Sequence, residues 1–229
     1  MNPKKIAAIL PAYNEAKKIA ALIAKIQKFI PDVIVVDDGS TDGTAEIAKR
    51  AGVCLIRHPQ NWGKGRALRS GFQYLLNQDY EGCILLDADG QHSPEDIPAF
   101  LNAASDPRVG VVIGDRMKET IAMPLVRRWT NWVMSFVLSK RLGEKIPDSQ
   151  CGFRYVSRAL LRLADLSTTR FAIDSELLME AKRHHFRIAS IPIRTIYHDE
   201  ESKIRPARDT YYFFKLLLSR RKRLGSGKR

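Results

Sequence analysis

Two aspartates stand one residue apart at the end of a short apolar run, in the stretch 84–91 (ILLDADGQ). An apolar run followed by turn residues is typical of a buried parallel strand, and ligands bind at the carboxyl ends of such strands. Two crowded carboxylates repel each other unless a cation lies between them. Asp87, Asp89 and the amide oxygen of Gln91 could therefore hold a hard divalent cation that carries substrate phosphates. The alternative is that the aspartates only cap the next helix.

Apolar runs alternate with helical patterns through the first half of the chain. The apolar runs lie at 5–10, 33–37, 53–57, 83–87 and 109–114, and the helical patterns lie at 16–29, 44–51, 65–77 and 94–104. This alternation predicts repeated strand–helix–strand units. The expected fold class is α/β, with a Rossmann-like, mostly parallel sheet flanked by helices.

Polar side chains also follow the first two predicted strands. Asp37 and Asp38 end the second run, and Tyr13 with its polar neighbours follows the first. Because parallel strands end at one edge of a sheet, one acid pair could hold a ribose or base edge while the other holds a metal. The alternatives are ordinary turn formation by the second acid pair and helix capping by Asn14.

The turn at 61–67 (NWGKGRA) opens the third helical pattern with two glycines and two cations. Backbone N–H groups at a helix start attract anions, so Lys64 and Arg66 could approach a phosphate. The spacing differs from a Walker A loop, because His58 stands in place of its first glycine and Gly65 in place of its Ser or Thr. A dinucleotide-binding GxGxxG is also missing after the first strand, which disfavours a nicotinamide enzyme.

The charge of the 229-residue chain is concentrated at one end. The formal net charge is +13, and residues 203–229 hold ten Lys or Arg against one acid, Asp209. This distribution disfavours nucleic acid as a general partner and predicts an anionic partner for the C-terminal segment. Because no leader-like or membrane-spanning apolar run occurs, we expect a cytoplasmic protein.

Four motifs in register resemble the inverting family 2 glycosyltransferases, which have the GT-A fold. They lie at 11–15 (PAYNE), 37–44 (DDGSTDGT), 61–67 (NWGKGRA) and 87–92 (DADGQH). Within that family the chain most resembles the dolichol- and polyprenyl-phosphate mannose synthase branch. The resemblance implies a metal-dependent transfer of one hexose, mannose or glucose, from a GDP- or UDP-linked nucleotide sugar to a polyprenyl phosphate.

The resemblance also implies residue roles on the donor side. Asp87, Asp89 and Gln91 would hold Mg²⁺ or Mn²⁺ and the donor diphosphate, with Asp89 also taking part in catalysis. The remaining donor-site residues that it implies are Pro11, Tyr13, Glu15, Asp37, Asp38 and Lys64.

The second half of the chain supplies the expected acceptor side. Arg116 follows the strand at 109–114, where a cation could reach a phosphate, and Asp148 begins a stretch, 148–154, that matches the family's acceptor loop. In the stretch at 202–205, which resembles the Ser-Lys-Ile-Arg segment of the polyprenyl-phosphate branch, Lys203 and Arg205 could neutralise phosphate charge. The resemblance implies catalytic roles for Arg116 and Arg205. The sequence lacks the Gln-x-x-Arg-Trp pattern of processive synthases, which favours single transfer.

Two further helical patterns leave alternatives open. The pattern at 124–142 carries Trp129, Trp132 and Phe136 beside basic residues, which suits either a membrane–water boundary or the core-facing stripe of an amphipathic helix. In the helix expected at 174–178, Glu176 could only cap, although the family places an acidic residue near the active site here. A last helix, 210–223, capped by Asp209, could lie on an anionic membrane surface or pack on the body or on a second subunit, as in a homodimer.

These expectations divide the chain into a GT-A domain at 1–208 and an amphipathic basic helix and tail at 209–229. Residues 1–115 would bind the nucleotide sugar and residues 116–208 the acceptor, with the protein at the inner face of the membrane. If the acceptor were a hydroxyl instead, Asp89 or Asp148 would be the candidate base. The rivals are a haloacid-dehalogenase-type phosphatase, whose Asp-x-Asp-Gly loop resembles residues 87–90, and a catalytically silent nucleotide-sugar-binding adaptor.

Overall fold

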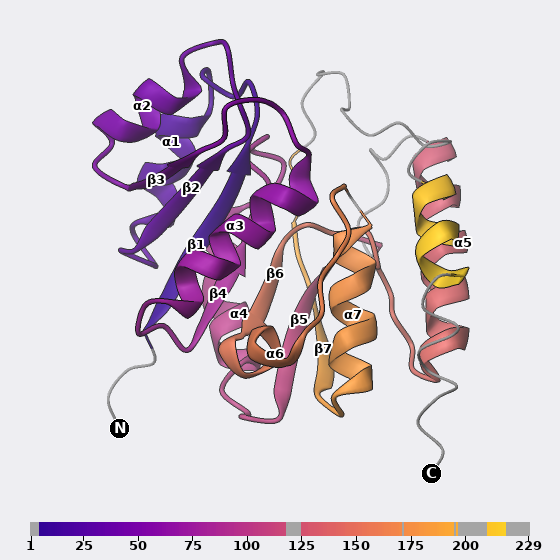
Figure 1. The fold of residues 1–229 in the computed structure, drawn as a ribbon. Helices are drawn as coiled ribbons and strands as arrows, with labels where there is room; N and C mark the ends of the chain where they lie inside the picture. Colours follow the sequence, from indigo (N-terminus) through magenta and orange to yellow (C-terminus); the bar gives the residue numbers. More distant parts are fainter. Residues whose placement is uncertain (1–4, 118–124, 171, 195, 197–209, 219–229) are drawn as a thin grey trace.

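The structure is a computed structural model that describes residues 5–117, 125–170, 172–194, 196 and 210–218. Seven strands form one mixed sheet in the order β3-β2-β1-β4-β6-β5-β7, and helices flank it (Figure 1). Every pairing is parallel except the two made by β6. The strands are β1 (Ile6–Ala12), β2 (Val33–Asp37), β3 (Cys54–Arg57), β4 (Gly82–Leu85), β5 (Val109–Asp115), β6 (Arg154–Ser157) and β7 (Arg187–Pro192).

The predicted alternation of strands and helices is confirmed, with shorter elements than expected. The helix predicted at 16–29 is only α1 (Ile19–Ile26), because the carbonyl of Glu15 accepts the N–H groups of Lys18 and Ile19 in a preceding turn. The helix predicted at 94–104 is a 3₁₀ turn (Pro94–Asp96) followed by α4 (Ile97–Ala103). The other helices are α2 (Thr44–Arg50), α3 (Lys64–Leu76), α5 (Leu125–Leu142), α6 (Arg158–Leu163) and α7 (Ile173–Arg183).

The register of the central strands brings the polar loops together. Ala12 of β1 pairs with Asp37 of β2, and Ile9 of β1 pairs with Leu85 of β4. The chain then leaves the sheet at Leu86, whose N–H still donates to the Ile9 carbonyl. The loops after β1, β2 and β4 therefore open at the same edge, as the sequence predicts.

The antiparallel strand β6 and the short α6 after it are missing from the sequence prediction. β6 has only four residues, all buried, and it begins with an arginine, so its letters do not read as an apolar run. It enters between β4 and β5 and pairs with both. Because β6 starts directly after the predicted acceptor loop, this insertion anchors that loop in the middle of the sheet.

The helix α5 has two faces with different surroundings. Met134, Leu138 and Leu142 are buried in the core, whereas Trp129 and Trp132 are more than half exposed. The core-facing reading of this pattern is therefore confirmed for one face only. In the described part of the chain, no helix combines the length and the apolar character needed to cross a membrane.

The last described helix, residues 210–218, packs one face on the protein. Phe213, Leu216 and Leu217 are buried within the hydrophobic core, and the guanidinium of Arg170 lies 5.6 Å from the ring centre of Tyr212. The packed alternative is confirmed for this face. The predicted cap Asp209 and the basic run at 220–223 lie outside the described residues.

A core substitution tests the arrangement around β6. Phe100 of α4 is fully buried and stacks on Phe153, with 4.2 Å between ring centres. We expect Phe100→Ala to lower the free energy of unfolding by about 3–5 kcal/mol through lost burial and a cavity. Chemical denaturation would measure it, with Phe136→Ala on the half-exposed face of α5 as the control, expected within about 0.5 kcal/mol of wild type. Equal effects of the two changes would contradict the packing described here.

Candidate functional site

The loops after β1 and β2 are joined by hydrogen bonds between side chains and backbone. The N–H groups of Asn14 and Glu15 donate to the hydroxyls of Ser40 and Thr44, both over 2.9 Å. In the other direction, Asn14 Oδ1 accepts the N–H of Thr41 over 2.9 Å. Asn14 holds a left-handed backbone conformation, with φ of 55°, which asparagine tolerates better than most residues. The first two sequence motifs thus form one interlocked unit.

Asp37 and Asp38 are both buried but have different surroundings. Asp38 accepts the N–H groups of Trp62 (3.0 Å) and Gly63 (2.7 Å), and Nδ1 of His58 lies 2.7 Å from it. Its carboxylate is therefore used to fix the turn before α3. Asp37 accepts the Ser40 N–H over 3.3 Å, and its Oδ2 lies 3.4 Å from Nε of the half-exposed Arg57 but accepts no hydrogen bond from the described residues. Asp37 is thus the better placed of the two to meet a ligand.

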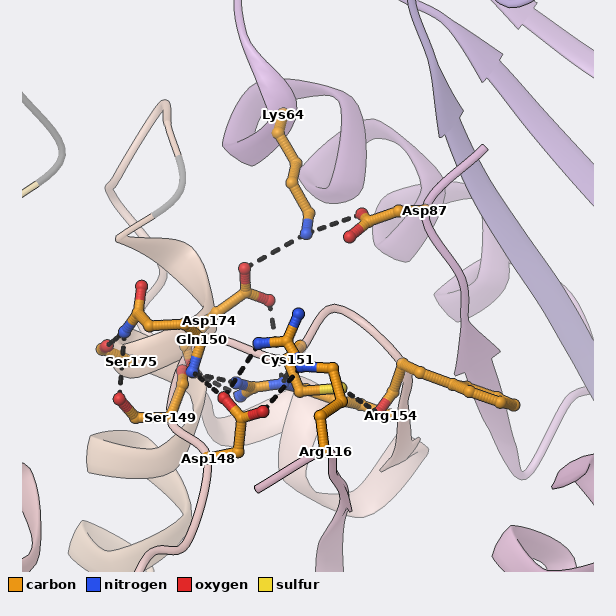
Figure 2. Close-up of polar contacts among 11 residues, drawn as sticks. Lys64, Asp87, Arg116, Asp148, Ser149, Gln150, Cys151, Arg154, Asp174 and Ser175 are labelled. Atoms are coloured by element: carbon orange, nitrogen blue, oxygen red, sulfur yellow. Dashed lines mark hydrogen bonds and ion pairs between the residues drawn. The ribbon is translucent and has the colours of Figure 1, made fainter. Parts of the chain in front are cut away.

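The ammonium of Lys64 lies between two carboxylates from distant parts of the chain (Figure 2). It is 2.7 Å from Asp87 Oδ1, just beyond β4, and 3.2 Å from Asp174 Oδ2, in the first turn of α7. Burial lowers the pKa of Lys64, but the charges of Asp174 and Asp87 outweigh burial and raise the pKa overall. Burial raises the pKa of Asp87, but the charges of Lys64 and then His92 lower it overall. Lys64 and Asp87 are therefore charged at neutral pH.

Asp89 has a less balanced environment. Burial and the nearby charge of Asp87 raise the pKa of Asp89 to about 6, and the charge of Glu15 contributes in the same direction. One carboxylate oxygen accepts the N–H of Gln91 over 3.0 Å, and the backbone carbonyl of Asp89 accepts Nζ of Lys18 over 2.9 Å. This crowding of acidic groups is what a bound cation would relieve.

The donor set at this edge fits a hard divalent cation. Asp87, Asp89 and Gln91 are half-buried and offer carboxylate and amide oxygens, which Mg²⁺ and Mn²⁺ prefer. Within the described ranges, no group of three His, Cys, Asp or Glu side chains gathers to bind a metal. A metal here would thus need Gln91, water or substrate oxygens to complete its ligands, which is typical of Mg²⁺ sites that carry phosphates.

Arg116 and Asp148 form a buried ion pair (Figure 2). Nε and Nη2 of Arg116 donate to the two carboxylate oxygens over 2.6 and 3.0 Å. Burial raises the pKa of Asp148, but the charge of Arg116 outweighs it, so the pKa is lowered overall. The sequence prediction had both side chains facing a substrate, whereas here they face each other. A carboxylate held in this way is a weak candidate for a general base.

Arg154 is a site residue that the sequence prediction did not single out. It is fully buried, and its guanidinium donates to the backbone carbonyls of Cys151 (2.6 Å), Ser149 (2.7 Å) and Asp174. One side chain therefore fixes the acceptor loop and the start of α7 together. Arg154 begins a buried strand, and its structural role follows from the sequence only if that strand is recognised first.

The position of Glu176 differs from both readings of the sequence. It is buried within α7, and its two carboxylate oxygens accept the N–H and hydroxyl groups of Ser167 and Thr168. It therefore caps a neighbouring loop instead of its own helix. The acidic side chain of α7 that contacts Lys64 is Asp174, two residues earlier.

The loop held by Glu176 packs against the start of α3. Side-chain atoms added at Gly63 or Gly65 would come within 2.6 Å of the carbonyl oxygens of Thr169 or Thr168. The glycines are therefore required by close backbone approach, and they bring Lys64 into place between the two halves of the chain.

The remaining predicted residues lie around this centre or outside the described chain. Pro11 pairs with Val36 inside the sheet, and Tyr13 follows the end of β1 with 37% of its surface exposed. Lys203 and Arg205 lie outside the described residues. The N–H of Ile196 donates to the carbonyl of Gln91 over 2.9 Å, so Ile196 lies beside the predicted metal site.

A family model for glycosyl transferase family 2 matches residues 7–163 of this chain, which is well over half of its length. The chain belongs to glycosyl transferase family 2. Its sequence is 33% identical over 220 residues to the UDP-N-acetylglucosamine–dolichyl-phosphate N-acetylglucosaminyltransferase of Methanococcus voltae, covering 86% of this chain and 88% of that relative. It is 28% identical over 214 residues to the undecaprenyl-phosphate mannosyltransferase of Micrococcus luteus, covering 87% of each. The predicted branch of the family is therefore confirmed.

A solved structure confirms the predicted fold class of this family 2 chain. Glucosyl-3-phosphoglycerate synthase from Mycobacterium tuberculosis, crystallised with Mn²⁺, UDP and glucosyl-3-phosphoglycerate, superimposes with a TM-score of 0.77. The alignment covers 95% of this chain and 80% of that one, at 19% sequence identity. The likeness establishes the GT-A fold.

The contact between the acceptor loop and Asp87 gives a prediction. A Cβ atom at Gly152 would collide with the carboxylate of Asp87. We expect Gly152→Ala to displace Asp87 and to weaken Mn²⁺ binding by about tenfold or more, while the fold survives. Isothermal titration with Mn²⁺ in the presence of nucleoside diphosphate would measure this change, with circular dichroism as the control for folding. Wild-type affinity in the variant would refute the contact.

Proposed function

We propose that this chain is an inverting, metal-dependent glycosyltransferase that moves one hexose from a nucleotide sugar to a polyprenyl phosphate. The observation that carries the proposal is the crowded pair Asp87 and Asp89 at the edge of the sheet where the nucleotide-side loops also open. The family membership and the polyprenyl-phosphate relatives support the choice of reaction and acceptor. Mannose and glucose, carried by GDP or UDP, are the proposed donor groups.

The proposed nucleoside site lies between the loops after β1 and β2. Oδ2 of Asp37 accepts no hydrogen bond and is paired only with the half-exposed Arg57 among the described residues, so it could accept an N–H or O–H of the nucleoside. Tyr13, which is partly exposed and follows the strand partner of Asp37, Ala12, offers a ring face for a base. Asp38 takes part indirectly, because its carboxylate holds the turn that leads to Lys64.

The proposed diphosphate site uses Asp87, Asp89 and Gln91, which would hold Mg²⁺ or Mn²⁺. When bound, this cation neutralises charge on the departing nucleoside diphosphate. Glu15 lies near enough for its charge to raise the pKa of Asp89, so it belongs to the same site. The role of Lys64 is to keep Asp87 ionised and oriented toward this site.

The acceptor step needs positioning more than proton removal. A phosphate oxygen of the acceptor attacks the anomeric carbon as the bond to the donor diphosphate breaks, and no proton has to leave because the phosphate is already ionised. Lys203 and Arg205, which lie outside the described residues, are the proposed phosphate contacts because they belong to the stretch that resembles the Ser-Lys-Ile-Arg segment of the polyprenyl-phosphate branch. A role for Arg116 stays a prediction, and its pairing with Asp148 would then orient both groups.

We place the protein at the cytoplasmic face of a membrane, because a polyprenyl phosphate lies there in lipid. The division into a donor half at 1–115, an acceptor half at 116–208 and a tail at 209–229 belongs to the same proposal. Binding of the tail to anionic lipid and formation of a homodimer stay predictions, and nucleic acid is not a proposed partner.

A substitution of Asp89 tests the metal assignment. We expect Asp89→Ala to lower the transfer rate by at least about a hundredfold, because charge on the leaving diphosphate loses its counterion, while the fold survives. The matched control is Asp79→Ala, which removes an exposed carboxylate after α3 and should leave the rate unchanged. Near-normal turnover of the Asp89 variant would refute the metal site.

A thermal-shift screen would identify the donor. We expect GDP- or UDP-hexoses with Mn²⁺ to raise the unfolding temperature, since a ligand that binds only the native state stabilises it by mass action. Stabilisation by neither nucleotide would contradict the donor assignment.

A transfer assay would test the acceptor. Transfer to a hydroxyl acceptor such as 3-phosphoglycerate, in place of a prenyl phosphate, would favour the alternative acceptor.

A further inference from the structure

The outer face of α5 presents an aromatic stripe away from the protein. Val126, Trp129, Trp132 and Phe136 follow one another at intervals of three or four residues and are 67%, 67%, 57% and 49% exposed. The rings of Trp132 and Phe136 stack, with 5.6 Å between their centres. Single exposed apolar residues are ordinary, but a continuous row of large ones indicates an interaction surface. Figure 1 shows α5 at the border of the molecule.

The charges of α5 indicate what this surface binds. The helix contains no acidic residue, and among its described side chains the exposed cations are Arg128 near its start and Lys140 near its end. The ammonium of Lys140 lies 5.8 Å from the ring centre of Phe136, so one cation borders the stripe directly. Tryptophan rings flanked by basic side chains suit a lipid surface, where the rings enter the headgroup region and the cations meet anionic groups.

A second copy of the chain fits this face less well. In a two-fold symmetric contact the same surface meets itself. Two α5 helices would then bring like charges together, with Arg128 against its own counterpart or against Lys140. Like charges in an interface oppose association. Anionic lipid avoids this repulsion.

The inner face of the same helix holds the acceptor loop. The hydroxyl of Ser135 accepts the N–H of Ser149 over 2.9 Å, and the hydroxyl of Ser139 accepts the N–H of Ile146 over 2.9 Å. Ser149 follows Asp148, which pairs with Arg116. A surface bound by the outer face is thereby kept at a fixed position relative to the acceptor side of the site.

We propose that the aromatic stripe of α5 (Trp129, Trp132 and Phe136), extended by the exposed Val126, docks the protein on an anionic lipid surface. The inference rests on the proposed function, because a polyprenyl-phosphate acceptor is presented in such a surface. It assigns the principal lipid contact to α5 and not to the C-terminal basic tail. It also explains why Trp129 and Trp132 are exposed, since neither ring is buried in the core.

Vesicle binding by the full chain tests the proposal. The probes are vesicles of phosphatidylcholine alone and of phosphatidylcholine mixed with phosphatidylglycerol. We expect wild type to bind the mixed vesicles, and the triple variant Trp129→Ser, Trp132→Ser, Phe136→Ser to bind at least about tenfold more weakly, because three aromatic side chains no longer enter the lipid. The matched control is Leu163→Ser, which removes a 54% exposed apolar side chain from α6 and should bind as wild type does.

Two further measurements distinguish the proposal from its alternatives, which are lipid binding by the C-terminal tail and contact with a second copy of the chain. A chain that ends at Ser219 lacks the basic run at 220–223, and we expect it to keep most of its vesicle binding. Loss of binding by this chain with retention by the triple variant would overturn the proposal in favour of the tail. Sedimentation without lipid would overturn it in favour of a second copy if wild type were a dimer and the triple variant a monomer.

Activity assays separate this inference from the proposed function. With a water-soluble short-chain prenyl phosphate, we expect the triple variant to keep its rate within about twofold of wild type, since no site residue is changed. With acceptor embedded in mixed vesicles its rate should fall along with binding. If wild type transferred to neither acceptor, the proposed function would fail, while vesicle binding would still decide the role of α5. Equal vesicle binding by wild type and the triple variant would refute the inference alone.

Discussion

The buried contact of Lys64 with Asp87 and Asp174 is the interaction on which the site depends. Its ammonium lies 2.7 and 3.2 Å from carboxylates that belong to opposite halves of the chain. The cation offsets the cost of placing these carboxylates in the interior, because an unpaired buried charge is unfavourable. The contact thus joins the nucleotide side of the sheet to α7 and keeps Asp87 available as an anion.

Several buried polar groups serve to hold Lys64 where it is. Asp38 fixes the turn before α3, and Glu176 fixes the loop that packs on Gly63 and Gly65. Arg154 ties the carbonyl of Asp174 to the acceptor loop. Taken one at a time, these acidic and basic residues resemble candidate catalysts. In the fold, they mainly hold the ammonium of Lys64 in place. The groups left for substrate are fewer, chiefly Asp37, Asp89 and Gln91.

Local patterns in the sequence were enough to predict the fold class and the donor edge. Apolar runs that end in polar turns indicate parallel strands. The four motifs fall on the loops that the sheet brings together. The antiparallel β6 was missed because it has only four residues and begins with Arg154, and the pairing of Arg116 with Asp148 was missed because it joins residues 32 positions apart. Such long-range pairings depend on the order of strands in the sheet, and local sequence patterns do not determine that order. For the same reason the two faces of α5 were separable only in three dimensions.

The central claim is that Asp87 and Asp89 support metal-dependent transfer of a hexose to a prenyl phosphate. Mass spectrometry of the acceptor tests it most directly, after incubation of the full chain with GDP- or UDP-hexose and a short-chain prenyl phosphate. The account predicts an acceptor heavier by one hexose when Mn²⁺ or Mg²⁺ is present and no product when the metal is chelated. Unmodified acceptor with every donor and metal, or equal product with and without chelator, would contradict it.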